Sequence, residues 1–356
     1  MPTKTRAAIL IQPNSPLVVD EIELPDPGPD QVLVKLFASG ICHSQLHQIH
    51  RPPDDPRAQQ ARPTLLGHEA TGVVVAHGRD VRHVREGDRV MTTWVDRGAS
   101  PGTVPRSRTE ATWNGQQVAV TTGTWTEYTL LSERLVVPLD PHAPTDVTSI
   151  IGCAVMTGAG AILNALQVRP GESVAVFGVG GIGLCAISAA AVVDAYPIIA
   201  VDLLEEKLTF AKRFGATHTV NASAGDPVEQ VRQLTGGGVD YAIDAIGAVP
   251  TQEQVLLATK PGVTALRRGG TALLVGIPQK QGHLDTNALL NGRTYMGTLG
   301  GDSRPDRDFP LYVRWYQEGK LKLDELITQR YPLEQINQAV DDLTNGRIFG
   351  RSIIEF

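Results

Sequence analysis

The hexapeptide GVGGIG, residues 178–183, restricts the fold of this chain more than any other stretch. It follows the apolar segment SVAVF and opens the helix-like segment GIGLCAISAAAVVDA. A glycine-rich turn between a buried strand and a helix is the phosphate-binding signature of dinucleotide-binding βαβ units. In such a turn Gly178 permits the tight bend, Gly180 lets the backbone approach a pyrophosphate, and Gly183 lets the helix pack closely on the strand.

The acid that accompanies this signature is also present. Asp202 lies nineteen residues after Gly183, at the end of the strand-like segment PIIAVD. A carboxylate there binds the ribose 2′-hydroxyl of NAD and repels the 2′-phosphate of NADP, and the next residues are Leu203 and Leu204 rather than arginines. The alternative is a purely structural turn with a solvated Asp202. Because motif, context and acid agree, the sequence predicts NAD as the cofactor.

The chain after residue 155 alternates between strand-like and helix-like segments. Strand-like segments are SVAVFG, PIIAVD, THTVNA, VDYAIDAIG and TALLVGIP, and the helix-like segments between them include EEKLTFAKRFGA and VEQVRQLTGG. This alternation predicts an α/β fold, with a doubly wound parallel sheet covered by helices on both faces.

The first 150 residues have a different pattern, with short strand-like segments between turns rich in proline and glycine. QVLVKLFASG, ATGVVVAHG and GDRVMTTWV are examples, and they indicate a β-barrel or sandwich. Residues 51–62 and 96–118 are polar and rich in proline or glycine, so we expect exposed loops there. After about residue 300, two amphipathic helix-like segments lead to the strand-like terminus RSIIEF.

Composition excludes several classes of protein. The 356 residues leave room for two domains, and 42% hydrophobic with 20% charged residues is typical of globular proteins. A net charge of −6 without a basic cluster argues against a nucleic-acid partner. We find no secretory leader and no run of about 18 uncharged apolar residues, which argues against a membrane partner. Three cysteines are too few for a disulfide framework, so we expect a cytoplasmic protein.

Metal-ligating side chains gather at three places in the chain. GICHSQLHQIH, residues 40–50, holds Cys42 and three histidines; LLGHEATG holds His68; and IIGCAVMTGAG holds Cys153. Catalytic zinc needs three protein ligands of this kind and one open position. Taken singly, a histidine is more often a surface residue and a cysteine a buried hydrophobe, and distant spacing alone does not show that the three converge.

Over essentially its full length the chain resembles the zinc-dependent alcohol dehydrogenases of the medium-chain dehydrogenase/reductase superfamily. GICHS, GHEATG, EGDRV, IIGCAVMTG, GVGGIG with Asp202, and RSIIEF appear in that family's order and spacing. The resemblance implies a GroES-like β-barrel catalytic domain (1–154), a Rossmann dinucleotide-binding domain (155–299) and a C-terminal return to the catalytic domain (300–356). It also implies a homodimer or homotetramer.

The resemblance further implies a role for each matching residue. Cys42, His68 and Cys153 match the catalytic zinc ligands. The other matching residues are Glu69 behind the metal; Ser44 and His47 in the proton relay; His43 and Arg351 at the pyrophosphate; Gly178, Gly180, Gly181 and Gly183 in the glycine loop; Asp202 and Lys207 at the adenosine ribose; Thr157 and Ile182 beside the nicotinamide; and Trp94 and Trp125 in the alcohol pocket. A place in the barrel core is the alternative for both tryptophans. We expect His50 on the surface and Cys185 in packing.

Two departures from the family pattern are visible. Residues 95–112, where relatives carry four cysteines for a structural zinc, contain none, so we expect one zinc ion per chain and no structural zinc. Gln45 stands where the family has an aspartate that accepts a hydrogen bond from the zinc histidine. An uncharged amide supports the ligand less well. We expect zinc to be easier to remove than in relatives, and Gln45→Asp to slow its loss if the shorter side chain reaches His68.

The resemblance implies a zinc-dependent alcohol dehydrogenase that transfers a hydride reversibly between NAD and an alcohol or aldehyde, and we expect primary alcohols. Two alternatives are a reductase of conjugated C=C bonds on the same fold and a non-catalytic dinucleotide-binding protein. Retention of the ligands and of the relay pair argues against both, although Gln45 favours the reductase slightly.

Overall fold

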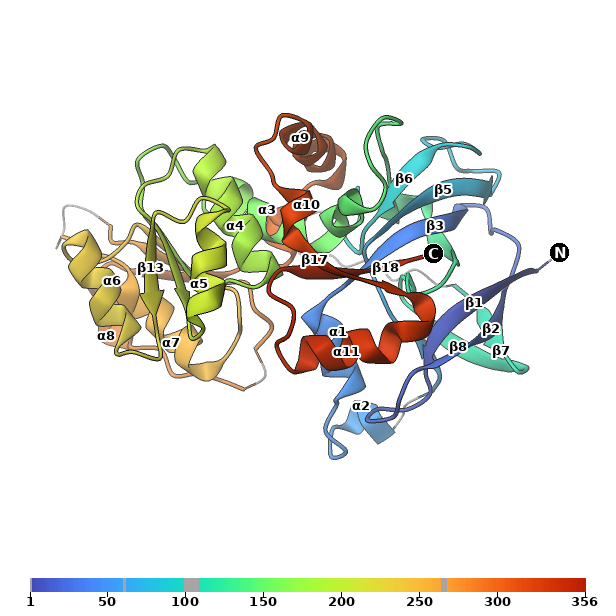
Figure 1. Ribbon diagram of the computed structural model, residues 1–356, viewed down its shortest axis with the longest axis horizontal. Coiled ribbons are helices and arrows are strands. Elements are labelled where there is room, and N and C mark those ends of the chain that lie inside the picture. Colours follow the sequence, from blue (N-terminus) through green and yellow to red (C-terminus); the bar gives the residue numbers. More distant parts are fainter. Residues whose placement is uncertain (1, 60–61, 99–108, 264–267, 279) are drawn as a thin grey trace. The chain divides into compact units, whose positions relative to one another are not determined.

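In the computed structural model the described residues are 2–59, 62–98, 109–263, 268–278 and 280–356 (Figure 1). They form two compact units. The first, the metal-binding unit below, comprises Met1–Cys153, Arg304–Gln317 and Leu323–Phe356, and the second, the dinucleotide unit, comprises Ala154–Ser303 and Glu318–Lys322.

The dinucleotide unit is built on a six-stranded parallel sheet in the order β13-β12-β11-β14-β15-β16. Helices α4 and α5 cover one face of the sheet, and α6 and α7 cover the other (Figure 1). This confirms the predicted doubly wound α/β fold. The strands are β11 (Val174–Phe177), β12 (Ile198–Asp202), β13 (His218–Asn221), β14 (Tyr241–Asp244), β15 (Thr271–Leu274) and β16 (Thr294–Gly297), and the helices are α3 (Met156–Gly160), α4 (Gly181–Val192), α5 (Glu205–Lys212), α6 (Pro227–Thr235), α7 (Val249–Ala258) and α8 (Thr286–Leu290).

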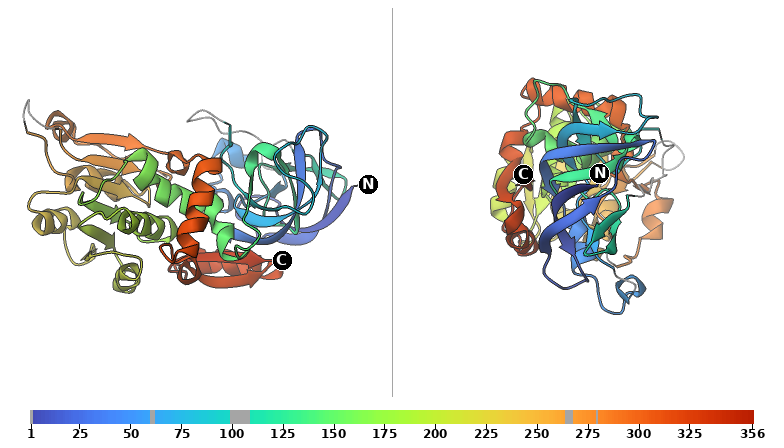
Figure 2. Two further views of the ribbon diagram at one scale, coloured as in Figure 1. Left: turned by 90° about the horizontal axis from the view of Figure 1, so that it is seen from above. Right: turned by 90° about the vertical axis from the view of Figure 1, so that its right-hand side faces the viewer.

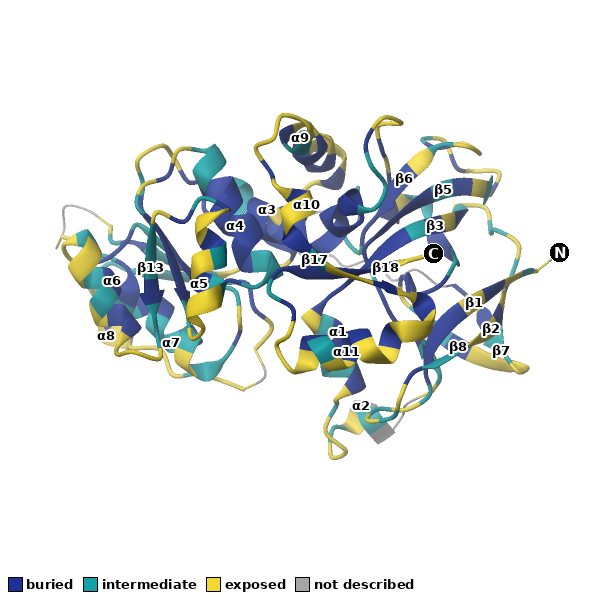
Figure 3. Cartoon of the chain, in the orientation of Figure 1, coloured by how far each residue is buried: buried dark blue, intermediate teal, exposed yellow. Residues whose placement is uncertain are grey.

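Local sequence explains several of these elements. All four residues of β11, VAVF, are buried, as expected for a central strand covered on both faces. Helix α6 begins with Asp226 as N-cap and Pro227 in its first turn, and it ends at Gly236 in the left-handed conformation. Figure 3 shows the strands buried and the outer faces of the helices exposed.

The metal-binding unit contains a closed barrel, β1-β2-β7-β8-β4, and a second sheet in the order β10-β6-β5-β3-β18-β17, with β9 also paired to β3. Figure 2 shows the N-terminal strands, in blue, curving round to close the barrel. The strands are β1 (Thr3–Leu10), β2 (Val18–Leu24), β3 (Gln31–Ile41), β4 (Thr64–Leu65), β5 (Ala70–His77), β6 (Arg89–Thr92), β7 (Ala111–Trp113), β8 (Gln116–Val120), β9 (Tyr128–Ser132), β10 (Val136–Pro138), β17 (Ile327–Pro332) and β18 (Arg351–Glu355).

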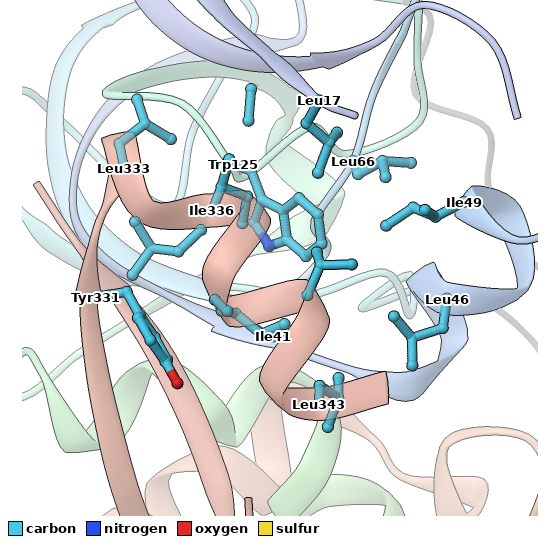
Figure 4. Packing of buried hydrophobic residues seen from close by; sticks show 14 of the residues in the cluster. Leu17, Ile41, Leu46, Ile49, Leu66, Trp125, Tyr331, Leu333, Ile336 and Leu343 are labelled. Atoms are coloured by element: carbon cyan, nitrogen blue, oxygen red, sulfur yellow. The ribbon is translucent and has the colours of Figure 1, made fainter. Parts of the chain in front are cut away.

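The helices of this unit are short apart from α9 and α11. They are α1 (His43–Ile49), α2 (Pro56–Gln59), α9 (Pro305–Gln317), α10 (Leu323–Leu326) and α11 (Ile336–Thr344). Helix α11 and the strand β17 pack on the barrel through a hydrophobic cluster that includes Leu17, Ile41, Trp125 and Ile336 (Figure 4). Strand β18, near the C-terminus, pairs with β3. The C-terminal segment therefore adds strands to the sheet that the N-terminal residues form.

Three sequence expectations need correction. The predicted loop 51–62 contains the helical turn α2. The predicted loop 96–118 includes strand β7 and the start of β8, which pair with Trp113 opposite Gln116, so that Asn114 and Gly115 form a two-residue turn. Both turn residues have positive φ, 50° and 76°. An Asn-Gly pair between strand-like residues is a strong hairpin signal that the loop expectation overlooked.

The third correction concerns the helical run Val147–Ala165, which the sequence expectations lacked. It has 19 residues without a charge and is long and apolar enough to cross a membrane by length and composition alone. Because its polar residues are threonine, serine and asparagine, a search for purely apolar runs passes over it. In this structure 89% of an 18-residue apolar window of this run is buried inside the protein, as is common for a core helix.

The segment after β6 is held by hydrogen bonds at its described residues 96–98. The Asp96 carboxylate is buried and accepts hydrogen bonds from Arg134 Nε (2.7 Å) and from the Gly98 N–H (2.7 Å). The Arg97 N–H donates to the Arg134 carbonyl oxygen at 3.0 Å, and the Arg97 side chain pairs with Asp306. Residues 99–108, most of the stretch where relatives hold a structural zinc, lie outside the described residues.

We expect Asp96→Ala to destabilise the protein by about 1–3 kcal/mol, because two donors lose a buried charged acceptor. Urea unfolding followed by tryptophan fluorescence measures the change. Glu21→Ala is the control. Both side chains of the Glu21–Lys4 ion pair are exposed, and exposed ion pairs contribute little to the free energy of unfolding. Equal effects of the two substitutions would show that Asp96 does not hold the segment.

Candidate active site

Cys42, His68 and Cys153 come together in the metal-binding unit, and their ligand atoms all lie within 4.8 Å of one another. Two thiolates about 2.3 Å from a tetrahedral zinc are separated by about 3.8 Å, so small movements would close this group around an ion. Among the described residues no other group of three histidine, cysteine or acidic side chains is arranged in this way. Both cysteines are buried, with 4% and 5% of their surface exposed, and His68 is half-buried.

The three ligands come from different parts of the unit. Cys42 directly follows strand β3 and is the N-cap of helix α1, His68 lies between β4 and β5, and Cys153 lies inside the helical run Val147–Ala165. The position of the third ligand, Cys153, depends on a close contact of its neighbour Gly152. A side chain on Gly152 would collide with the Thr92 carbonyl oxygen, and the Thr93 hydroxyl donates to the Gly152 carbonyl oxygen at 3.0 Å. Strand β6 therefore fixes the backbone next to this ligand.

The donor set suits zinc. The hydrogen bond with Cys153 lowers the pKa of the Cys42 thiol well below its usual value, and the positive charge of Arg351 and a hydrogen bond with His68 lower it further, whereas burial raises it. The thiolate is the form that binds metals, so these contacts favour the ligand state. Two sulfur ligands and one imidazole are a common protein set for catalytic zinc.

Gln45, which lies on helix α1, contacts two of the ligand residues, Cys42 and His68. Its Oε1 accepts a hydrogen bond from the Cys42 N–H at 2.9 Å, and its Nε2 contacts His68 Nδ1. The sequence expectation that Gln45 lies against His68 therefore agrees with its position, but the amide oxygen is occupied by Cys42. Because Nδ1 faces Gln45, the other ring nitrogen, Nε2, is the one available to a metal.

Glu69 lies behind the ligands and is fully buried. Its carboxylate occupies the space that a side chain on Gly40 would need, and it forms an ion pair with Arg351, whose side chain is only 6% exposed. Arg351 thus has an acidic partner inside the metal-binding unit. Its predicted contact with a cofactor pyrophosphate stays a prediction.

Helix α1 carries the predicted relay residues Ser44 and His47. They lie three positions apart and therefore on neighbouring parts of the helix surface. Both are half-buried, and burial lowers the pKa of His47, which favours its neutral, proton-accepting form. His43 is exposed at the start of the helix, and His50 is exposed at its end, where its ring is 3.3 Å from the Thr344 hydroxyl.

The two tryptophans lie in different surroundings. Trp94 lies edge-on to His68, with ring centroids 6.4 Å apart, beside the candidate metal site. Trp125 is 1% exposed, belongs to the cluster beneath helix α11 and donates from Nε1 to the Gly40 carbonyl oxygen at 3.2 Å (Figure 4). This burial favours the alternative, a place in the core, and the predicted place in a substrate pocket stays a prediction.

The glycine loop of the dinucleotide unit has the form that the motif predicts. Gly178 has φ = +92°, and Gly183 approaches the Gly178 carbonyl oxygen so closely that a side chain would collide with it. Around Gly180, the N-cap of helix α4, nothing lies within 4 Å of where a side chain would begin. This open space above a helix N-terminus suits a pyrophosphate.

Asp202 connects the loop to the next strand. One carboxylate oxygen accepts from the Val179 N–H at 3.0 Å and the other from the Leu204 N–H at 3.2 Å. The remaining predicted cofactor residues of this unit, Gly181, Ile182, Lys207 and Thr157, lie on helices α4, α5 and α3, and the Thr157 hydroxyl is buried without a hydrogen-bond partner in the described structure. Cys185 is buried in α4, where burial raises the pKa of its thiol, as expected for a packing residue.

Comparison with known proteins agrees with this arrangement of metal ligands and dinucleotide fold. Residues 28–141 match the family described as "Alcohol dehydrogenase GroES-like domain", and residues 181–318 match "Zinc-binding dehydrogenase". Alcohol dehydrogenase 1 of Pisum sativum is 32% identical over 373 aligned residues, which cover 96% of this chain and 95% of the relative.

Two solved structures are also similar. The alcohol dehydrogenase zinc-binding domain protein from Burkholderia ambifaria has a TM-score of 0.90 and 31% identity, with 100% of both chains covered. Benzyl alcohol dehydrogenase from Acinetobacter calcoaceticus has a TM-score of 0.88 and 31% identity, with 99% of both chains covered. Fold and site define an oxidoreductase of the medium-chain type. The chain belongs to its zinc-type alcohol dehydrogenase family.

We expect loss of the Gln45 bridge to speed zinc release, because Gln45 orients both the backbone at Cys42 and the His68 ring, and partners that orient the ligands strengthen metal binding. Gln45→Ala should weaken zinc retention by about 10–100-fold, measured as the rate of transfer to a coloured chelator. Gln45→Glu should slow release, since its two oxygens match the length of glutamine and can accept from Cys42 and His68 together. The shorter aspartate is less able to reach both residues.

Gln48→Ala is the control for this experiment, because Gln48 is a half-buried glutamine of the same helix with no part in the bridge. Release that is unchanged in Gln45→Ala, or equally fast in Gln48→Ala, would mean that Gln45 does not support the ligands.

Proposed function

We propose that this alcohol dehydrogenase uses NAD and a single zinc ion per chain to interconvert primary alcohols and aldehydes. The observation that carries the proposal is the grouping of Cys42, His68 and Cys153, with thiol chemistry suited to zinc, in a chain whose second unit carries the glycine loop and Asp202. The similarity to benzyl alcohol dehydrogenase supports a primary alcohol, and Trp94 beside His68 would favour a flat substrate.

In this proposal the zinc ion would act as a Lewis acid toward the alcohol, and NAD would accept the hydride. The protein residues bind, orient and move a proton. Cys42, His68 and Cys153 would hold the ion, Gln45 orients the His68 ring, and Glu69 pairs with Arg351. The Ser44 hydroxyl and then the neutral His47 imidazole take the alcohol proton toward solvent. Asp202 would accept hydrogen bonds from the adenosine ribose.

A panel assay tests the proposal. Purified, zinc-loaded protein is given NAD with ethanol, longer primary alcohols, secondary alcohols and benzyl alcohol, and NADH formation is followed by absorbance. The reverse reaction is run with the corresponding aldehydes and with conjugated enones. Oxidation of primary alcohols supports the proposal. Turnover of enones alone, or none with any alcohol, would overturn it.

The number of metal ions gives a sharper test. Elemental analysis of metal-replete protein should find one zinc per chain, because three ligands are present and the structural cysteines are absent. Cys153→Ala should lose zinc and turnover while still binding NADH through the dinucleotide unit. Two tightly held zinc ions per chain would contradict the prediction.

Cofactor preference tests the role of Asp202. Wild-type kcat/KM should be much higher with NAD than with NADP, because the carboxylate binds the 2′-hydroxyl and repels a 2′-phosphate. Asp202→Gly should reduce the difference in kcat/KM between NAD and NADP, mainly by lowering kcat/KM with NAD. Equal kcat/KM for the two cofactors in the wild type would exclude this role.

A further inference from the structure

Asp244, the last residue of strand β14, is fully buried and has no part in the site described above. Its Oδ1 accepts three hydrogen bonds at 2.9 Å, from the Ile246 N–H, the Gly247 N–H and the Thr251 hydroxyl. One carboxylate oxygen thus fixes both the turn after β14 and the first turn of helix α7.

This turn contacts the glycine loop on one side. The Ile246 side chain fills the space where a side chain on Gly178 would lie, so the two residues are in close contact. Gly178 is the residue at which the loop bends toward helix α4. A change in the position of Ile246 would therefore alter the packing at Gly178, the start of the glycine loop.

On its other side the turn contacts the segment after β15. Gly247 has φ = +82°, and a side chain on it would lie 2.5 Å from the Ile277 carbonyl oxygen. The Val275 and Gly276 N–H groups donate to the Asp244 carbonyl oxygen at 2.9 and 2.8 Å. Gly276 and Ile277 in turn line a pocket of about 300 Å³, together with Thr298 and Leu299 after β16.

The turn therefore lies between two parts of the carboxyl edge of the sheet. Parallel α/β sheets bind their ligands at this edge, close to where the strand order reverses. Here the reversal falls between β11, which leads into the glycine loop, and β14, which ends at Asp244. A bound dinucleotide that extends from the glycine loop toward the pocket would need a fixed distance between the glycine loop and the segment after β15.

We propose that Asp244 is a positioning residue for the dinucleotide, which holds the Ile246–Gly247 turn and thereby sets the spacing between the glycine loop and the pocket after β15. The inference rests on the proposed binding of NAD. The residue itself does not touch the cofactor, because it is fully buried and acts through the turn.

The acceptor at Oδ1 matters here more than the charge. Asp244 Oδ2 is buried and has no hydrogen-bond partner in the described structure, and burial raises the pKa of the carboxyl. Asparagine keeps an oxygen in the place of Oδ1 and removes the buried charge. Asp244→Asn should therefore preserve the turn, whereas Asp244→Ala leaves three donors without an acceptor.

Asp240 provides a matched control at the other end of the same strand. Its carboxylate accepts from the Ser173 N–H at 3.0 Å and from the Ser173 hydroxyl at 2.7 Å, and it pairs with Lys260. It has the same residue type and a similar set of bonds, but it precedes β14 and so belongs to the amino edge, where no ligand is expected.

The experiment measures NADH dissociation constants by fluorescence titration and thermal midpoints for the wild type and three variants. Asp244→Ala should raise the dissociation constant about tenfold, and Asp244→Asn should stay within about twofold of the wild type. Asp240→Ala should lower the thermal midpoint as Asp244→Ala does but leave the dissociation constant within about twofold.

A wild type that fails to bind NADH would refute the proposed function itself. If the wild type binds, unchanged binding in Asp244→Ala, equal weakening in Asp240→Ala, or failure of asparagine to restore binding overturns the inference. Should Asp244→Ala not fold, Thr251→Val decides. It removes one of the three donors, and the inference requires it to weaken NADH binding measurably, while unchanged binding overturns it.

Discussion

The buried ion pair between Glu69 and Arg351 is the contact on which the metal-binding unit depends. It joins the segment before β5 to the first residue of the last strand, and both side chains are nearly or fully inaccessible. The pairing of Ser352 with Ile41 places Arg351 next to the end of β3, which Cys42 directly follows. Removing one partner of such a pair leaves a buried charge, at a typical cost of about 3–5 kcal/mol. The position of the first metal ligand therefore depends on the C-terminal strand.

The same pair explains the electrostatics of the ligands. Arg351 contributes to the low pKa of Cys42, so it helps create the thiolate that a metal needs. Glu69 balances this arginine, and without it the positive charge would oppose a metal cation. Gln45 adds no charge to this balance and acts through hydrogen bonds alone. The charges around the candidate site are thus supplied by residues that lie far apart in the sequence.

Local patterns predicted the dinucleotide unit better than the metal-binding unit. The glycine loop, Asp202 and the strand–helix alternation are features of short segments, whose conformation depends on neighbouring residues. Trp125 shows why the metal-binding unit was harder to predict from local sequence. It is buried against helix α11, which lies about 210 residues later in the chain. The convergence of the ligands and the direction of the Gln45 amide also depend on distant contacts. The hairpin at Asn114 and Gly115 is different, since its signal was local and was missed.

Residues 95–112 contain no cysteine, and hydrogen bonds hold the described part of the segment after β6. Four cysteines on zinc form a crosslink that needs little support from the surrounding protein, whereas a chain without them must hold its backbone by other contacts. At the described residues 96–98 these contacts come from Arg134, which both donates to the Asp96 carboxylate and accepts from the Arg97 N–H. Because Arg134 lies two residues after β9, which pairs with β3, the segment is tied to the sheet whose strand β3 leads into Cys42. The contact between Asp96 and Arg134 is therefore connected through one sheet to the candidate catalytic metal site.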